Sequence, residues 1–160
     1  MKTDRAVASF EAVNMVFVTW DESYSVCVES IDTQHKKMMS MINDLHNTMM
    51  DGEPTPKIAE VLKRLESYTE EHFRYEEEIF DQYNYPQADE HKKQHNDLVQ
   101  RVKAFRDRIT NHQEKVGEEL LNFLLFWLGN HIKKVDRQYI AFMLEKGIKW
   151  PPDVEIIQKI

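Results

Sequence analysis

Hydrophobic residues recur every three or four positions along four long stretches of the chain, with polar residues between them. This spacing is typical of amphipathic helices, because an α-helix turns by about 100° per residue and brings such positions onto one face. The apolar stripes cover residues 31–49, 58–80, 91–109 and 121–142. Breaker residues at 51–56, 84–86 and 117 separate them. We therefore predict four helices of about 20 to 30 residues joined by short loops.

Local signals indicate where several of these helices begin and end. Asp32 has the short polar side chain of an N-cap and is predicted to begin the first helix, which ends at Asp51 and Gly52. The third helix is expected over residues 88–111. The last helix is expected to follow Gly117 and to stop near Gly147, a residue type favoured just after a helix.

Four helices joined by short loops favour an all-α fold, an up-down-up-down four-helix bundle. We interpret residues 1–18 as an N-terminal extension, residues 19–146 as the bundle and residues 147–160 as a short C-terminal tail. Either end of the chain could serve self-association or a protein partner. The last helix has a second apolar side with Phe123, Phe126 and Trp127, and we expect the aromatic N-terminal arm to cover it.

Composition restricts the class of partner. The 160 residues suit one domain, and 28 acidic against 21 basic residues, a net charge of −7, argue against binding to nucleic acid or to anionic membranes. The single cysteine excludes an internal disulfide. The most apolar run near the start, residues 13–20, contains Asn14 and Thr19 and has the character of neither a signal peptide nor a membrane span. We expect a soluble, cytoplasmic protein that binds small molecules or other proteins.

Seven residues with metal-ligand chemistry lie on the four predicted helices, and all but Asp136 belong to the apolar stripes. Two pairs have the i, i+4 spacing that lets both side chains reach one ion, His72 with Glu76 and His91 with His95. In a helical bundle, ligand side chains on facing helices project into the common interior. The seven candidates are His35, His72, Glu76, His91, His95, His131 and Asp136.

Each candidate also has an ordinary structural interpretation. A single histidine on an apolar stripe is more often a hydrogen-bonded core residue, and the lysines beside His91 and His95 are typical of a solvated helix face. Burying five imidazoles together would cost a few kcal/mol for each one without a hydrogen-bond partner, and a metal removes that cost. We therefore favour a metal site, and interpret His46 and His112 as surface residues and Glu77 and Glu78 as solvated.

These residues resemble the hemerythrin family, specifically its bacterial single-domain members, over about residues 19–145. The matching fragments are Trp20, Tyr24-Ser25-Val26, Ile31-Asp32, Gln34-His35-Lys36, His72-Phe73, Glu76-Glu77, His91, His95, Trp127-Leu128, Asn130-His131-Ile132 and Asp136. Each fragment is weak by itself. Seven ligands in the family's order and spacing across four helices are a specific signal.

The resemblance implies a non-haem di-iron centre that binds molecular oxygen reversibly. In the family's pattern one iron is held by the residues matching His91, His95 and His131, and the other by those matching His35 and His72. Glu76 and Asp136 would bridge the two irons beside an oxo or hydroxo bridge, which leaves one open position on the second iron. Leu128 and Ile132 match the aliphatic residues of the family's oxygen pocket.

The ligand chemistry agrees in part with iron, because imidazole and carboxylate suit it, whereas zinc prefers four ligands and often thiolates. We expect an oxygen carrier, store or delivery protein. The alternatives are an oxygen or redox sensor acting through a partner protein, and a di-iron enzyme that uses oxygen or peroxide. We expect no enzyme activity, because the stripe residues near His131 are aliphatic or aromatic and offer no acid or base.

Two positions leave alternatives open. Cys27 stands where the family often has glycine, and we interpret it as a small buried apolar residue, with a redox role as the alternative. His131 and Asp136 are five residues apart, which in a regular helix separates them by about 140°. Either they flank the inward direction, or a π-bulge brings them together.

Overall fold

The computed structural model describes residues 16–112 and 115–149. Along these residues the chain forms the short 3-10 helix η1 and then four long helical segments, the last interrupted by a π-helix. Their bounds are η1 Glu22–Tyr24, α1 Glu29–Met50, α2 Thr55–Tyr83, α3 Ala88–Thr110, α4 Gly117–Asn130, η2 (the π-helix) His131–Asp136 and α5 Arg137–Glu145. The predicted residues 1–15 of the extension and 150–160 of the tail lie outside the described part.

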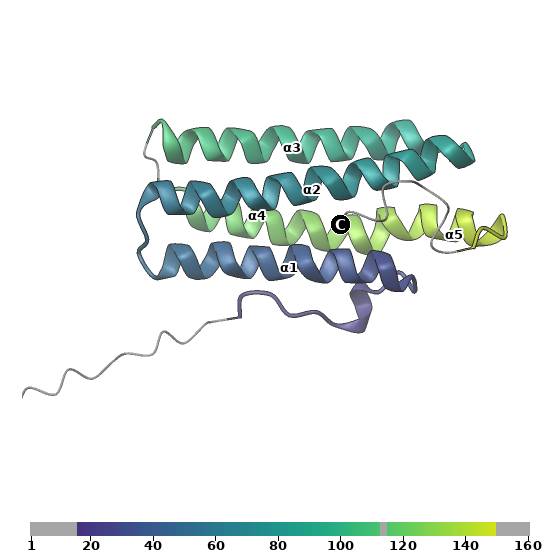
Figure 1. The fold of residues 1–160 in the computed structure, drawn as a ribbon, viewed down its shortest axis with the longest axis horizontal. Coiled ribbons are helices and arrows are strands. Elements are labelled where there is room, and N and C mark those ends of the chain that lie inside the picture. Colours follow the sequence, from purple (N-terminus) through teal and green to yellow (C-terminus); the bar gives the residue numbers. More distant parts are fainter. Residues whose placement is uncertain (1–15, 113–114, 150–160) are drawn as a thin grey trace, which may run out of the picture.

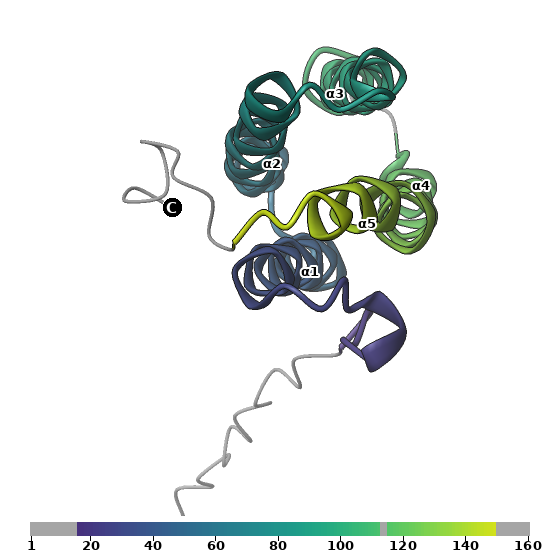
Figure 2. The same ribbon diagram turned by 90° about the vertical axis from the view of Figure 1, so that its right-hand side faces the viewer.

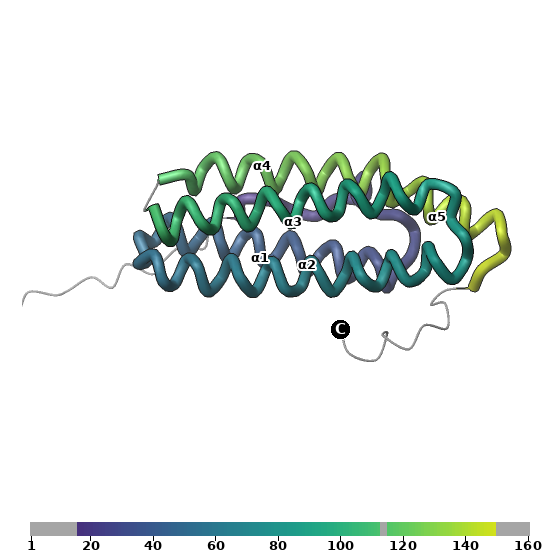
Figure 3. The backbone as a smooth tube through the Cα atoms, turned by 90° about the horizontal axis from the view of Figure 1, so that it is seen from above, coloured from purple at the N-terminus to yellow at the C-terminus, as the bar shows by residue number. Residues whose placement is uncertain are grey.

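The helices run back and forth along one long axis (Figures 1 and 3). Viewed from the end, α1 neighbours α2, α2 neighbours α3, α3 neighbours α4, and α4 with α5 returns to α1 (Figure 2). The predicted all-α four-helix bundle is therefore confirmed. No helix within the described residues combines the length and apolar character needed to cross a bilayer.

The prediction that Asp32 begins the first helix is wrong. Helix α1 starts at Glu29, and Asp32 lies in its first turn. The Asp32 carboxylate instead accepts hydrogen bonds from the Val26 N–H at 2.8 Å and the Ser25 hydroxyl at 2.6 Å. It therefore closes the loop before the helix.

The last bundle segment ends near Gly147 as predicted. Gly147 has a φ of 70°, and its N–H donates to the Leu144 carbonyl at 2.9 Å. The Ile148 N–H donates to the Met143 carbonyl at 3.1 Å. This is the left-handed helix ending that glycine adopts without strain.

The π-helix η2 keeps the last segment in register with the core. Leu120 in α4 and Met143 in α5 are both fully buried although they are 23 residues apart. In an uninterrupted α-helix that separation would place them on faces about 140° apart. A π turn takes in one extra residue, which rotates the following helix back toward the same face.

The N-terminal arm runs alongside α1, and Asn43 of α1 holds it there by hydrogen bonds. The Asn43 side-chain oxygen accepts from the Phe17 and Val18 N–H groups at 2.8 and 2.9 Å, and its amide donates to the Val18 carbonyl at 2.8 Å. Phe17 thereby stacks on His46, with ring centroids 4.8 Å apart. His46 is consequently buried, so its interpretation as a surface residue is wrong.

The rest of the arm packs against η2 and its flanks. Arg137 donates to the Ser23 and Ser25 carbonyls at 2.8 and 3.1 Å, and the Lys133 ammonium lies 3.9 Å from the centre of the Tyr24 ring. Phe126 stays 74% exposed. The expectation that the arm covers this side of the last helix is therefore wrong for Phe126.

Cys27 is exposed, which contradicts the prediction of a small buried residue. Its backbone φ is 62°, a left-handed conformation that turns the arm into α1. Glycine adopts such a φ at little steric cost, whereas a residue with a side chain is strained there.

Candidate metal centre

All seven predicted ligands meet inside the bundle, in the half nearer the α2–α3 turn. None of them is more than 4% exposed. They form two groups of potential ligand atoms that share Glu76. The larger group is Glu76, His91, His95, His131 and Asp136, and the smaller is His35, His72 and Glu76.

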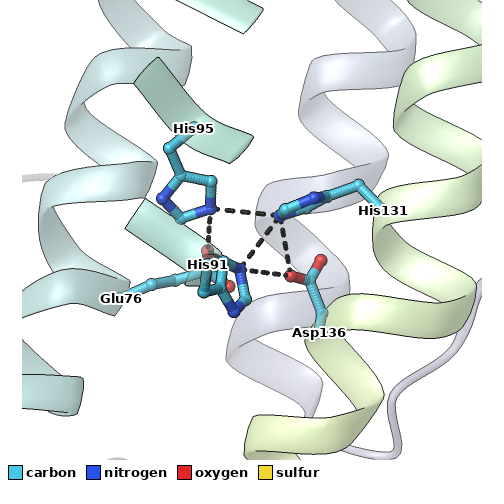
Figure 4. Close-up of side chains that lie close together, drawn as sticks. All are labelled: Glu76, His91, His95, His131 and Asp136. Atoms are coloured by element: carbon cyan, nitrogen blue, oxygen red, sulfur yellow. Dashed lines mark hydrogen bonds and ion pairs between the residues drawn. The ribbon is translucent and has the colours of Figure 1, made fainter. Parts of the chain in front are cut away.

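Three imidazoles of the larger group point at one place. His131 Nε2 lies 3.0 Å from His91 Nε2 and 3.1 Å from His95 Nε2 (Figure 4). A neutral imidazole has only one N–H, so such a cluster cannot satisfy every nitrogen with hydrogen bonds. Ligands about 2.1 Å from one ion and at right angles to each other would be about 3.0 Å apart. The spacing therefore fits nitrogens that share an ion.

Each carboxylate faces both groups of histidines. Asp136 Oδ1 lies 3.1 Å from His131 Nε2 and 3.2 Å from His91 Nε2, whereas its Oδ2 lies 3.3 Å from His35 Nε2.

Glu76 is arranged in the same way. Its Oε2 lies 3.3 Å from His95 Nε2, and its Oε1 lies 3.6 Å from His72 Nε2. Both carboxylates thus present one oxygen to each histidine group, so each could offer a ligand atom to both groups.

Helix η2 resolves the two alternatives left open for His131 and Asp136. These residues are the first and last of the π-helix. With a wider turn, both side chains reach the interior, so the π-bulge alternative is correct and the regular helix is not. Such bulges are frequent at functional sites.

Burial and charge set the protonation of the group. Burial raises the pKa of Glu76, but the surrounding imidazoles, led by His72, outweigh it and bring the pKa down to about 2. Burial lowers the pKa of His72 to about 4, against the opposing charge of Glu76. Near pH 7 the carboxylate is anionic and His72 is neutral, and these are the states that bind metals.

Several buried atoms of the cluster have no hydrogen-bond partner in the described part of the chain. Among the described residues, both nitrogens of His35 and both oxygens of Asp136 lack a partner with hydrogen-bond geometry. Leaving such groups unpaired is costly in a protein interior. A bound cation would use the lone pairs of both residues, so this set of donors fits a metal.

Two further residues contact the Nδ1 atoms of histidines in the cluster, and the sequence analysis gave neither residue a role at the site. Gln34 Oε1 lies 2.6 Å from His72 Nδ1, and Glu77 Oε1 lies 2.9 Å from His95 Nδ1. The interpretation of Glu77 as simply solvated is therefore wrong. The sequence feature that could have indicated these roles is adjacency to a candidate ligand, since Gln34 precedes His35 and Glu77 follows Glu76.

Aromatic rings cover the histidines of the larger group. Phe73 stacks on His95 with centroids 3.7 Å apart, and Trp127 stacks on His131 at 4.2 Å. An apolar cavity of about 30 Å³ lies beside them, lined in part by Trp127 and Leu128. Ile132 is fully buried next to His131.

His112 is 61% exposed and pairs with Asp107, in agreement with its surface interpretation.

Comparison with known proteins gives one consistent match. The sequence pattern of the Hemerythrin HHE cation binding domain matches residues 27–143. The chain is 36% identical over 126 residues to a bacteriohemerythrin of Pseudomonas aeruginosa strain LESB58, covering 79% of this chain and 81% of the relative. It is 33% identical over 120 residues to a myohemerythrin of Theromyzon tessulatum, covering 75% and 88%. A crystal structure of wild-type hemerythrin superimposes with a TM-score of 0.72 at 30% identity, covering 78% and 96%.

Proposed function

The chain belongs to the hemerythrin family, and on that premise we propose that it binds molecular oxygen reversibly, as a carrier or store, at a pair of non-haem irons. The observation that carries this proposal is the placement of the two carboxylates. Glu76 and Asp136 each direct one oxygen to His35 or His72 and the other to two of the remaining three histidines. Carboxylates shared in this way serve two ions better than one.

In this proposal His91, His95 and His131 hold one iron, and His35 and His72 hold the other. Glu76 and Asp136 would each offer a carboxylate oxygen to both irons, with an oxo or hydroxo group as a further shared ligand. The iron at His35 and His72 would then have one protein ligand fewer, and it would be the one open to oxygen. When bound, the two irons supply the electrons that oxygen takes up on binding and returns on release.

The chain's own residues would make the binding reversible by keeping water and outside anions away. Phe73 and Trp127 cover two histidines by stacking, and Leu128 and Ile132 add aliphatic surface on the same side as His131. Apolar side chains that exclude water slow the displacement of bound oxygen by water, protons and anions. We therefore assign Leu128 and Ile132 to the oxygen pocket.

Stopped-flow mixing distinguishes this function from its alternatives. The iron-loaded, reduced protein is mixed with oxygen, and the oxygen is then removed. A carrier or store returns to the spectrum of the reduced state over repeated cycles. Irreversible oxidation accompanied by turnover of an added reductant would contradict the proposal and indicate an enzyme.

A further inference from the structure

The two histidines that face Glu76 from opposite sides differ in what supports them from behind. His72 and His95 both turn Nε2 toward Glu76 and Nδ1 away from it. The partner of His72 Nδ1 is the neutral amide oxygen of Gln34, at 2.6 Å. The partner of His95 Nδ1 is the carboxylate of Glu77, at 2.9 Å.

This difference matters because the partner of Nδ1 controls the ligand nitrogen. An imidazole that offers its Nε2 lone pair to a metal carries its proton on Nδ1 and donates it to the partner. Hydrogen bonds to a charged acceptor are roughly twice as strong as those between neutral groups. A carboxylate partner therefore makes the imidazole a stronger electron donor than an amide partner does.

The position of Glu77 suits a supporting role and not direct coordination. Its side chain is 32% exposed. It lines a surface pocket of about 280 Å³ between α2 and α3, which His95 also lines from the inside. Water can solvate one side of the carboxylate while Oε1 holds His95. Phe73 already restricts the orientation of the His95 ring by stacking on it. The further effect of Glu77 is therefore electrostatic, because its negative charge strengthens the electron donation of His95 Nε2.

We propose that Glu77 is a positioning residue that makes the ion at His91, His95 and His131 the more tightly held of the two. Gln34, with its neutral amide, leaves the ion at His35 and His72 the more exchangeable. This inference rests on the two-ion centre proposed above. It assigns to two residues outside the ligand set a part of the difference in ion retention, beyond what the third histidine contributes, so it can be tested by substituting them.

The test uses the full chain loaded with ferrous iron under anaerobic conditions and challenged with excess ferrozine, a ferrous chelator. The unmodified protein should lose its ions in a fast and a slow phase. Glu77→Gln keeps an acceptor oxygen and removes the charge, and it should accelerate the slow phase by about 10- to 100-fold. Gln34→Glu makes the opposite change behind His72 and should slow the fast phase.

Glu78→Gln is the matched control. Glu78 is the next residue of α2 and is partly buried, and its substitution removes the same charge. Within the described part of the chain it is not hydrogen-bonded to a histidine, in contrast to Glu77. Both phases should stay within about twofold of the unmodified rates in this variant. The reduction potential gives a second reading that a purely structural role would not move, since Glu77→Gln should raise it and Glu78→Gln should not.

Two results would overturn the inference while leaving the di-iron proposal intact. They are a slow phase in Glu77→Gln that matches the unmodified protein, and an equal acceleration in Glu78→Gln. Equal helical circular dichroism of the metal-free variants excludes misfolding as the cause of a change. A metal count of one ion per unmodified chain would instead contradict the proposed centre itself, and the inference would fall with it.

Discussion

His131 Nε2 lies 3.1 Å from Asp136 Oδ1, although a regular α-helix would place these residues on faces about 140° apart. The π-helix that begins at one and ends at the other brings them together. The same turn lets Asp136 Oδ2 reach to 3.3 Å from His35 Nε2 on α1. A single local irregularity thus connects the two histidine groups.

Removal of either carboxylate that we propose as a bridge should disrupt the paired site. We expect Glu76→Ala and Asp136→Ala to bind fewer than two irons per chain, because each carboxylate faces both histidine groups. Elemental analysis of the purified, iron-loaded variants measures this.

The controls for the carboxylate variants are His112→Ala, at an exposed residue, and His46→Ala, at a buried residue outside the cluster. Both should keep two irons, although the latter loses its stacking with Phe17. Loss of iron in the controls would show that the proposed ligand set is incomplete.

Removal of metal should lower the stability of the whole bundle. Ligands from α1, α2, α3 and the η2 segment converge only when the chain is folded, so metal binding adds to the free energy of unfolding. The gain is about 4 kcal/mol when the free metal is 1,000 times its dissociation constant. Thermal unfolding of the metal-free and iron-loaded proteins tests this, and equal midpoints would contradict it.

The metal-free protein should lose stability as the pH falls from about 6.5 to about 4. A histidine in the unfolded chain has its ordinary pKa of 6.5, whereas burial disfavours the charged form of His72 and lowers its pKa to about 4 in the folded protein. Between these values the unfolded chain binds a proton that the folded chain does not, so the free energy of unfolding decreases with falling pH. The contribution of His72 is about 3 kcal/mol in total, fully present above pH 6.5.

Urea unfolding at pH 7 and pH 5 measures this effect, with His72→Gln as the comparison. The variant retains the other titrating groups, including His95, so the difference between the two proteins reports His72 together with its effect on the pKa of Glu76. A variant with the same pH dependence as the unmodified protein would refute the assignment.

Leu128→Ala and Ile132→Ala should keep iron but autoxidise and bind azide faster. Either truncation is expected to cost about 2 to 5 kcal/mol of stability, as for ordinary core residues. Leu120→Ala serves as the control, since Leu120 is a fully buried leucine of the same helical segment, eleven residues before His131. If all three variants autoxidise alike, Leu128 and Ile132 only fill space.

Cys27→Gly should stabilise the protein by up to about 1 kcal/mol. A residue with a side chain at a φ of 62° carries a steric cost of about 1 to 2 kcal/mol, partly offset by the greater chain entropy of glycine. Cys27→Val should destabilise it, because a β-branched residue tolerates this conformation poorly. Chemical unfolding compares the two variants. A more stable valine variant would argue against backbone strain at this position.

The sequence by itself determined the four helices, the bundle and the identity of the residues that converge inside it. These features follow from periodicity, since a residue at helical spacing on an apolar stripe must face the core whichever neighbours cover it. Asp136 is the exception, because in a regular helix it would lie about 140° from His131. His72 with Glu76 and His91 with His95 could be paired on spacing alone. Such local geometry needs no knowledge of the other helices.

Only the tertiary structure decided the features that depend on contacts between distant segments. His46 is buried because Asn43 holds Phe17 over it, and that contact spans 26 residues of sequence. Glu77 supports His95 because α2 and α3 pack side by side, and no period marks a partly exposed glutamate as a partner. The π-helix was one of two geometries open to His131 and Asp136. Packing chose it, because only an extra residue in that turn lets α4 and α5 both bury their apolar faces while the two ligands meet.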